Sequence, residues 1–336
     1  MLASAQVRGR TVPSGHIPAG SRIECCTHAG TRRCPYSDPK RRTESEQIED
    51  SMKIILSRKG IDSSFSSLVS PILPNGTLSW IPLPERPQSN PRIPVFEEIS
   101  TGRASMGEVL GQLSGQTFDR RRRAHLDPDL VESHLKRALG WKPSFGQSGS
   151  AERHLRNNGV AEGDLFIFYG SFRQTELVNG TLRYVRGAPS LHVIFGWLQI
   201  DHRVDVATHE PWPEWMLTHP HVLREPNEAL DAIYFPTQEL TGLALSGSRP
   251  GAGTFGMLRP DLVLSDPNGP RSRWILPADF LPGVRSPLTY HSNENRWESL
   301  GETVALRSAS RGQEFVLDLD QYQGVKSWIE NQIFSP

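Results

Sequence analysis

The pattern of apolar and polar positions places all of the predicted strands after residue 52. The run KIIL at residues 53–56 is typical of a short buried strand. Residues 163–187 are strand-like, and Asn179-Gly180 between TELV and TLRYV is the strongest hairpin signal in the chain. The segment LHVIFGWLQI at residues 191–200 is mostly apolar on both faces, which predicts a central strand.

Helical periodicity is confined to a few segments. SMGEVLGQLSG at residues 105–115 predicts a short helix, and YQGVKSWIENQIF at residues 322–334 predicts a closing one. An amphipathic helix is also predicted by the apolar positions Leu130, Val131, Leu135, Ala138 and Leu139. Strands and helices do not alternate regularly. The sequence therefore predicts an α+β fold with a mixed, largely antiparallel sheet and flanking helices.

The first fifty residues differ in composition from the rest. Residues 1–51 are rich in Arg, Ser, Gly and Thr, show no period of strand or helix, and lack the apolar core of a secretory signal. We expect a disordered or spurious N-terminal extension, translated from a start upstream of Met52, with a cleaved organelle presequence as the lesser alternative. Residues 52–334 are expected to form a single domain.

Charge and cysteine content narrow the class of protein. The chain has 37 basic and 37 acidic residues, so no global field attracts nucleic acid or an anionic membrane. No apolar run approaches the roughly 18–20 residues of a membrane helix. Cys25, Cys26 and Cys34 all precede Met52, which argues against a secreted domain held by disulfides. We expect a cytoplasmic protein without a membrane partner.

The densest polar cluster follows the first predicted strand, in SRKGIDSS. Strand ends that open into polar loops commonly carry sites. Arg58 and Lys59 would suit a phosphate, and Asp62 could orient one of them or hold a sugar hydroxyl. Ser63 and Ser64 add hydroxyls to the same substrate-binding candidate. The alternative is an ordinary ion pair at a turn.

A second candidate lies in HLDPDL. An H-x-D pair such as His125 and Asp127, joined by a distant histidine, is the ligand set of non-haem iron sites. The favoured alternative is a helix start, in which Asp127 caps, Pro128 takes the first helical position and Asp129 faces the macrodipole. Capping explains both carboxylates but leaves His125 without a role.

Other polar residues give weaker signals. Arg173 emerges from an apolar strand and needs a carboxylate or a phosphate partner. His291 could hydrogen-bond a base edge or form a polar turn. The pair His219 and His221 could bind a metal, but no cysteine or close carboxylate completes it, so packing of an aromatic loop is favoured. The sequence identifies no cofactor, and no metal ligand is assigned.

Several segments together resemble one family. These are MKIILSRKGIDSS, VSPILPNGTL, HLDPDL, GDLFIFYGSFR, HVIFGWLQI and YHSNENRW. They are similar to the nucleotide modification associated domain 3 family from about Met52 to the C-terminus, although serines replace the glycines that usually follow Asp62. The resemblance implies a setting in bacterial and phage systems that modify DNA bases, more than a particular reaction.

A shorter resemblance points to a barrel. GDLFIFYGSF followed by HVIFGWLQI is similar to the Gly-Asp strand and the later glycine strand of PUA and EVE domains, which read modified bases. A PUA-like barrel portion is therefore part of the expected fold.

Three hypotheses of function follow. In the first, the protein is an enzyme acting on a base or nucleotide, with Asp62, His125 and Asp127 supplying acid–base or metal function. In the second, it is a non-catalytic reader of modified nucleic acid, and in the third a structural protein. The expected partners are a nucleotide or nucleic acid and other modification-system proteins. A concave site uniting Asp62, His125 and Arg173 would favour the enzyme, and a barrel with an aromatic cage would favour the reader.

Overall fold

The computed structural model describes residues 52–61, 67–224, 230–310 and 314–335. The expected N-terminal extension, residues 1–51, lies outside the described residues, as do Asp62, Ser63 and Ser64. Among the helices of the described ranges, none has the length and apolar character to span a bilayer.

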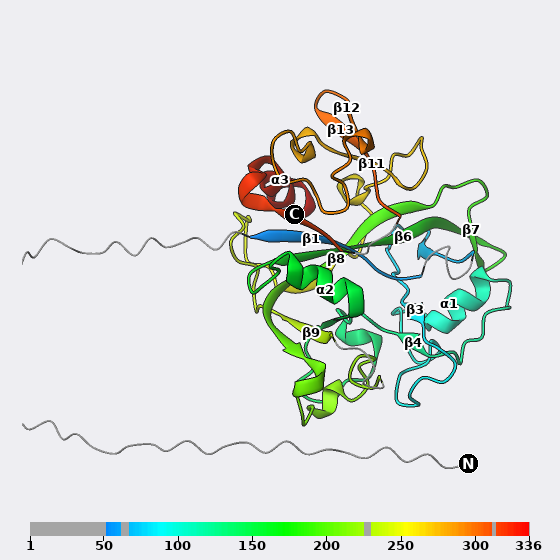
Figure 1. Ribbon diagram of the computed structural model, residues 1–336. Coiled ribbons are helices and arrows are strands. Elements are labelled where there is room, and N and C mark those ends of the chain that lie inside the picture. The colour runs from blue at the N-terminus through cyan, green and yellow to red at the C-terminus, as the bar shows by residue number, and fades with distance from the viewer. Residues whose placement is uncertain (1–51, 62–66, 225–229, 311–313, 336) are drawn as a thin grey trace, which may run out of the picture. The chain divides into compact units, whose positions relative to one another are not determined.

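A mixed sheet of nine strands forms the centre of the fold (Figure 1). Strand β1 pairs in parallel with β6 and antiparallel with β14, whereas β6, β8, β9 and β5 are joined antiparallel. The sheet curls into a half-barrel, and the PUA-like barrel portion stays a prediction. Its main path runs β14 (Glu314–Asp318), β1 (Lys53–Arg58), β6 (Leu165–Val178), β8 (Leu191–Asp205), β9 (Asp231–Pro236) and β5 (Phe145–Ser148), and the side strands are β2 (Ser70–Ile72), β7 (Thr181–Tyr184) and β10 (Ala252–Thr254).

Smaller elements cover this sheet. The second sheet and α3 lie on one side of it in Figure 1, and α2 lies on the other beside β9. The second sheet contains β11 (Arg273–Pro277), β13 (Thr303–Arg307) and β12 (Trp297–Ser299), and the third pairs β3 (Leu83–Pro84) with β4 (Ala124–His125). The helices are α1 (Met106–Leu113), α2 (Gly149–Asn157) and α3 (Gln323–Trp328), the last continuing into a π-turn. A sheet-rich α+β class is thus confirmed, but the flanking helices are few and short.

The two long central strands carry the core. Residues 165–172 of β6 and 192–200 of β8 are buried throughout. Burying a large apolar side chain contributes about 1.5–3 kcal/mol relative to leaving it exposed, so these runs fix the sheet. The central position predicted for residues 191–200 is confirmed, because β8 lies between β6 and β9.

The hairpin prediction is also confirmed. Val178 of β6 pairs with Thr181 of β7, and only two residues connect them. Asn179 and Gly180 have φ values of 51° and 78°, as both central residues of a type I′ turn require.

The helix predicted from Leu130 to Leu139 is absent. The segment forms only a short 3-10 turn, Glu132–His134, and Leu139 is fully exposed. The Arg137 guanidinium binds both carboxylate oxygens of Asp129 and the carbonyl of Val131, which holds the segment in an irregular loop. Helical capping by Asp127 is therefore wrong, and its carboxylate has partners elsewhere.

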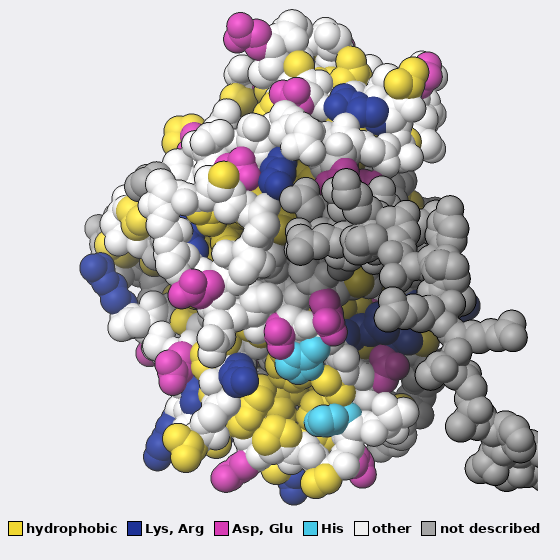
Figure 2. All heavy atoms as spheres, turned by 90° about the vertical axis from the view of Figure 1, so that its left-hand side faces the viewer, with side chains coloured by type: hydrophobic (Ala, Val, Ile, Leu, Met, Phe, Trp, Pro, Cys, Tyr) yellow, Lys and Arg dark blue, Asp and Glu magenta, His cyan; other side chains and the backbone are white. Residues whose placement is uncertain are grey.

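One face of the molecule shows mixed charge. On the face drawn in Figure 2, basic and acidic side chains are interspersed. This mixture agrees with the net charge of zero and directs attention to local sites rather than to a broad charged surface.

Candidate functional site

A polar cavity of about 580 Å³ opens where β1, β4, β5 and β14 come together. Its wall combines three cationic side chains, two carboxylates and three imidazoles, drawn from segments far apart in the sequence. These charged and imidazole side chains are Arg58, Lys59, Arg224, Asp127, Glu314, His125, His154 and His221.

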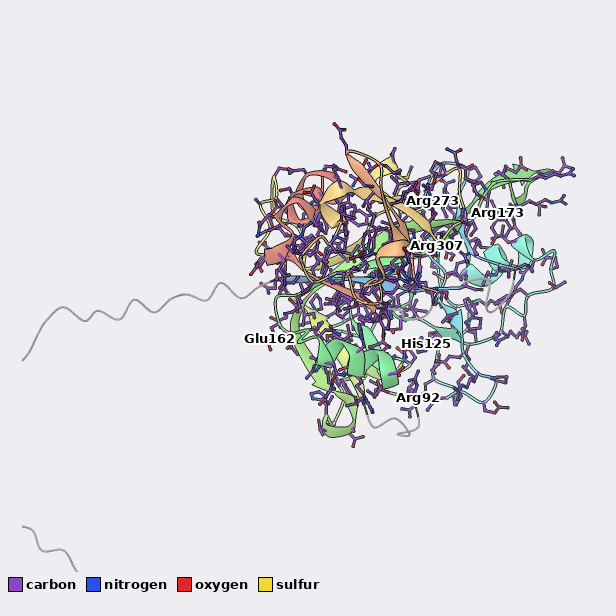
Figure 3. The ribbon with its side chains drawn as sticks, turned by 45° about the horizontal axis from the view of Figure 1, so that its top comes forward. Arg92, His125, Glu162, Arg173, Arg273 and Arg307 are labelled. Carbon is purple, nitrogen blue, oxygen red and sulfur yellow. The ribbon has the colours of Figure 1, made fainter. Side chains whose placement is uncertain are left out.

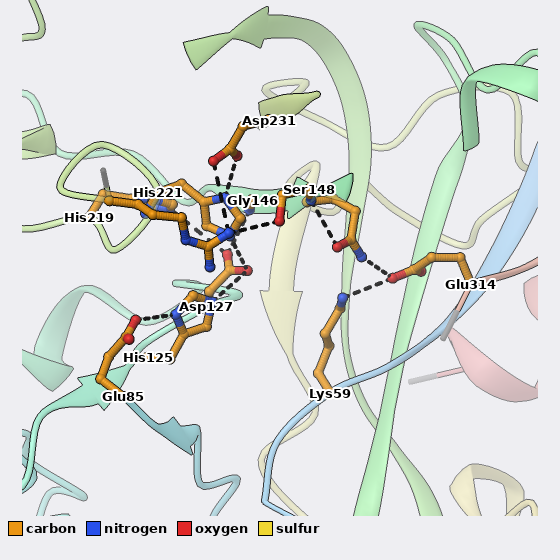
Figure 4. A network of polar contacts seen from close by, with 12 residues as sticks. Lys59, Glu85, His125, Asp127, Gly146, Ser148, His219, His221, Asp231 and Glu314 are labelled. Carbon is orange, nitrogen blue, oxygen red and sulfur yellow. Dashed lines mark hydrogen bonds and ion pairs between the residues drawn. The ribbon is translucent and has the colours of Figure 1, made fainter. Parts of the chain in front are cut away.

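One wall of the cavity holds a cluster of His125, Asp127 and His221 (Figure 4). The Nε2 atom of His125 is 3.8 Å from Asp127 Oδ2, and the Nε2 atom of His221 is 3.6 Å from the same oxygen. One ligand atom from each residue lies within 4.8 Å of the others. The chain brings them together from the end of β4, the segment just after it, and the loop that precedes β9.

A carboxylate fixes each imidazole from behind. His125 Nδ1 is 2.6 Å from Glu85 Oε1, and His221 Nδ1 is 2.5 Å from Asp231 Oδ1. An ionised carboxylate can accept hydrogen bonds but cannot donate them, so each Nδ1 carries the hydrogen. Each ring then turns its Nε2 atom toward Asp127.

Glycine at position 146 makes this arrangement possible. The Gly146 amide donates a 2.7 Å hydrogen bond to Asp127 Oδ1. A Cβ atom at this position would lie 2.3 Å from Cδ2 of His221, closer than any side chain tolerates. Strand β5 therefore needs glycine here so that the ring of His221 can lie against its backbone.

Electrostatics keep the Asp127 carboxylate ionised. Burial alone would raise the pKa of Asp127, but its interactions with His221, His125 and His219 outweigh burial and hold the pKa well below its usual value. Burial opposes the charged form of His221, yet Asp127 and Asp231 raise its pKa overall. Asp127 is thus a fixed negative charge rather than a proton donor.

A third imidazole lies behind the cluster. His219 is buried, and burial lowers its pKa to about 3, so the ring is neutral. Its Nδ1 accepts the His221 amide at 3.3 Å, which leaves the hydrogen on Nε2. That nitrogen is 3.9 Å from Asp127 Oδ1 and has no hydrogen-bond partner among the described residues.

The opposite wall is organised around Glu314. Lys59 Nζ is 2.8 Å from Glu314 Oε1, and Gln147 donates to the same oxygen at 2.5 Å. Lys59 also lies over the Phe145 ring, 4.3 Å from its centroid. Its charge is therefore largely neutralised by Glu314, which weakens it as a phosphate ligand.

Arg224 and an aromatic pair complete the lining. One Arg224 nitrogen donates to Ser148 Oγ at 2.8 Å and is 4.0 Å from Asp231 Oδ2, and about a third of the side chain is exposed. The rings of His154 and Tyr290 lie 4.6 Å apart at the cavity edge. These groups could contact an anion and a flat ring.

The structure brings four of the sequence-predicted residues to the cavity and places two elsewhere. Arg58, Lys59, His125 and Asp127 line it. Arg173 lies far from His125 (Figure 3), where it donates to the Val185 carbonyl over the Tyr184 ring.

His291 is fully buried outside the cavity lining. Its Nδ1 contacts the Thr289 carbonyl at 2.8 Å, and its Nε2 accepts the Ala309 amide at 2.9 Å. Both ring nitrogens are therefore used within the protein. Asp62, Ser63 and Ser64 lie outside the described residues.

Sequence reasoning missed one of the three members of the cluster, His221. The His219-x-His221 pair is visible, but a carboxylate close in sequence was the wrong criterion, because Asp127 comes from a different element. No motif in the sequence identified four further residues of the site, Glu85, Asp231, Arg224 and Glu314. Asp231, ten positions after His221, is the one residue that a wider window would have found.

Comparison with known proteins gives one match. Residues 53–318 match the family model described as nucleotide modification associated domain 3. The resemblance carried by the sequence motifs is confirmed over this range. No curated protein and no solved structure matches the chain.

Proposed function

We propose that this chain, which belongs to the nucleotide modification associated domain 3 family, binds a nucleotide in its cavity and modifies it. The substrate is a free nucleotide or a single nucleotide unit of a nucleic acid. The observation that carries the proposal is the presence of arginines and the His125–Asp127–His221 cluster in one cavity.

The cavity has the size and lining of a small-molecule site. Ligand sites usually measure about 300–1,000 Å³, and about 580 Å³ suits one nucleotide rather than a duplex. Arg224 and Arg58 offer guanidinium groups for the phosphate. Tyr290 and His154 offer ring faces on which a base can stack.

The His–Asp cluster distinguishes an enzyme from a reader. A reader needs only phosphate contacts and a stacking surface, and the His154–Tyr290 pair would serve it equally well. A carboxylate can also accept a hydrogen bond from a base edge, but a buried Asp127 whose pKa is held this far below its usual value is the kind of perturbed group that marks reactive centres. The cluster therefore favours catalysis.

Calorimetric titration tests the binding step. We expect 5′-deoxynucleoside monophosphates or short single-stranded oligonucleotides to bind more tightly than the matching nucleosides. Arg224→Ala should weaken binding about 10- to 100-fold, because a charge-assisted hydrogen bond contributes about 1.5–3 kcal/mol. Arg183→Ala, an exposed position on β7 outside the cavity lining, is the matched control and should bind normally.

Mass spectrometry tests the chemical step. The protein is incubated with nucleotide extracts and with oligonucleotides, and the nucleosides are then analysed for mass changes. A new nucleoside that disappears with His125→Ala supports the enzyme. Binding without any mass change, unaffected by His125→Ala, identifies a reader. Failure of every nucleotide and oligonucleotide to bind refutes the proposal.

A further inference from the structure

We propose that His125, Asp127 and His221 hold a divalent transition-metal ion at the wall of the cavity. The inference deepens the proposed function, on which the catalytic relevance of the ion rests. The ion site itself is independent of any nucleotide, and it follows from the geometry of the donor atoms.

The separations between the donor atoms are those of metal ligands rather than of hydrogen-bonded groups. The two His–Asp separations of 3.6 and 3.8 Å exceed hydrogen-bond length. Two atoms bonded to one ion at about 2.1 Å lie at most about 4.2 Å apart, and both separations fall within that limit. With all three atoms within 4.8 Å, a small inward shift of the imidazoles is sufficient for binding.

The groups behind the imidazoles match those that support metal ligands. Metal-bound histidines almost always donate their other N–H to a carboxylate or carbonyl, which fixes the tautomer and raises ligand basicity. Glu85 does this for His125, and Asp231 does it for His221. Two independent carboxylate–imidazole pairs aimed at one carboxylate are hard to explain by packing alone.

His219 supplies a separate indication that something binds here. Its side chain is only 4% exposed, and its Nε2 faces Asp127 without a hydrogen-bond partner among the described residues. A buried polar group without a partner costs about 1–3 kcal/mol. A water or hydroxide carried by the ion would give this nitrogen an acceptor.

The donor set indicates the class of ion. Calcium and magnesium prefer oxygen ligands, whereas two imidazoles and one carboxylate suit Fe²⁺, Mn²⁺ or Zn²⁺. Three protein ligands leave positions open toward the cavity, as in catalytic rather than structural sites. Such an ion would polarise a substrate oxygen or lower the pKa of a bound water.

Metal titration of the full chain, without nucleotide, tests the inference. The protein is stripped with a chelator and titrated with Co²⁺, read by visible absorption, and then with Zn²⁺, Mn²⁺ and anaerobic Fe²⁺, read by calorimetry and elemental analysis. We expect one equivalent to bind to the wild type. His125→Ala should weaken binding at least 100-fold, and Glu85→Gln about 10- to 100-fold.

A matched control excludes adventitious binding. His202→Ala removes an exposed imidazole that also contacts a carboxylate, Asp201, and it should leave ion binding unchanged. The inference is overturned if the stripped wild type binds none of these ions more tightly than His125→Ala, or if His202→Ala weakens binding equally. If His125→Ala does not fold, the ion affinity of Glu85→Gln is compared with that of the wild type instead.

The two proposals fail separately. Nucleotide binding to the stripped protein without any ion binding would refute the metal site and leave the proposed substrate intact. Ion binding without nucleotide binding would refute the proposed substrate and leave the metal site intact.

Discussion

Histidines occur in two different settings in this protein. On the cavity wall, His125 and His221 each have a carboxylate behind Nδ1 and face Asp127 with Nε2. In the packed interior, His192 accepts the Trp274 indole N–H at 2.9 Å, and His291 is held by backbone groups. Imidazoles met by neutral groups serve packing, whereas the imidazoles that carboxylates orient toward Asp127 are those that we propose as metal ligands.

The same contrast separates two neighbouring aspartates. Asp129 is bound by Arg137 at 2.7 and 2.6 Å and by the Trp141 indole, so its charge is matched inside the fold. Asp127 receives one backbone hydrogen bond, from Gly146, and otherwise faces imidazoles beyond hydrogen-bond distance. Asp129 is thus held in a structural ion pair, whereas Asp127 is the aspartate that we propose as a metal ligand.

The largest effect is expected from Asp129→Asn. This change leaves the buried Arg137 guanidinium without its ionic partner and should lower the free energy of unfolding by about 3 kcal/mol. Urea denaturation measures the loss. Metal affinity should stay unchanged, because Asp129 does not line the cavity.

Asp127→Asn is expected to have the opposite effects to Asp129→Asn. It keeps an oxygen for the Gly146 amide but removes the charge, so ion binding should be lost with a smaller loss of stability. Equal destabilisation by both asparagine variants, with equal ion affinities, would remove the distinction between the two aspartates.

Gly146→Ala should have the next largest effect. The new Cβ would lie 2.3 Å from the His221 ring, which must move out of the cluster, and we expect ion affinity to fall at least 100-fold. Gly256→Ala is the control, since nothing lies within 4 Å of a Cβ there and its φ is not positive. Cobalt absorption compares the two, and a normal spectrum in Gly146→Ala would contradict the geometry of the cavity wall.

His192 allows the packed interior to be tested by pH. Burial lowers the pKa of His192 from 6.5 to about 3, so between these values the unfolded chain binds a proton that the native protein does not. The stability that the neutral His192 imidazole contributes is fully present above pH 6.5 and is lost as the pH falls toward 3. This residue contributes a slope of about 1.4 kcal/mol per pH unit within that window.

Urea denaturation between pH 6.5 and 4 measures this slope in His192→Gln. The slope should decrease in the variant, while ion binding at pH 7 stays normal. His209→Gln, an exposed position, should keep the wild-type slope. An unaltered slope in His192→Gln would show that this imidazole is not the buried neutral group inferred here.

The smallest effect concerns the hairpin tip. Gly180 has a φ of 78°, which alanine adopts only with strain, so Gly180→Ala should cost about 1 kcal/mol of stability. Ion and nucleotide binding should be unaffected, as the turn is not part of the cavity lining. Thermal unfolding measures the cost, and a change in ligand affinity would show that the turn and the cavity are coupled.

Prediction from sequence succeeded where local patterning decides structure. The Asn179-Gly180 turn specifies its own φ values, and the apolar run at residues 191–200 requires burial on both faces. It failed for residues 130–139, where apolar spacing is helical but the Asp129–Arg137 ion pair fixes a loop. A side-chain pair of this strength outweighs a propensity that is worth tenths of a kcal/mol per residue.

Local sequence patterns were sufficient to predict the strand regions at 53–56, 163–187 and 191–200, the hairpin, the family, and the polar character of the first strand's end and of the His125–Asp127 segment. Packing in three dimensions brings His221 to Asp127 and places Glu85 and Asp231 behind the two rings. The physical reason is that these contacts depend on how separate strands and loops pack together. Hydrophobic periodicity sets which face of a strand is buried, but it does not set which distant loop will lie beside it.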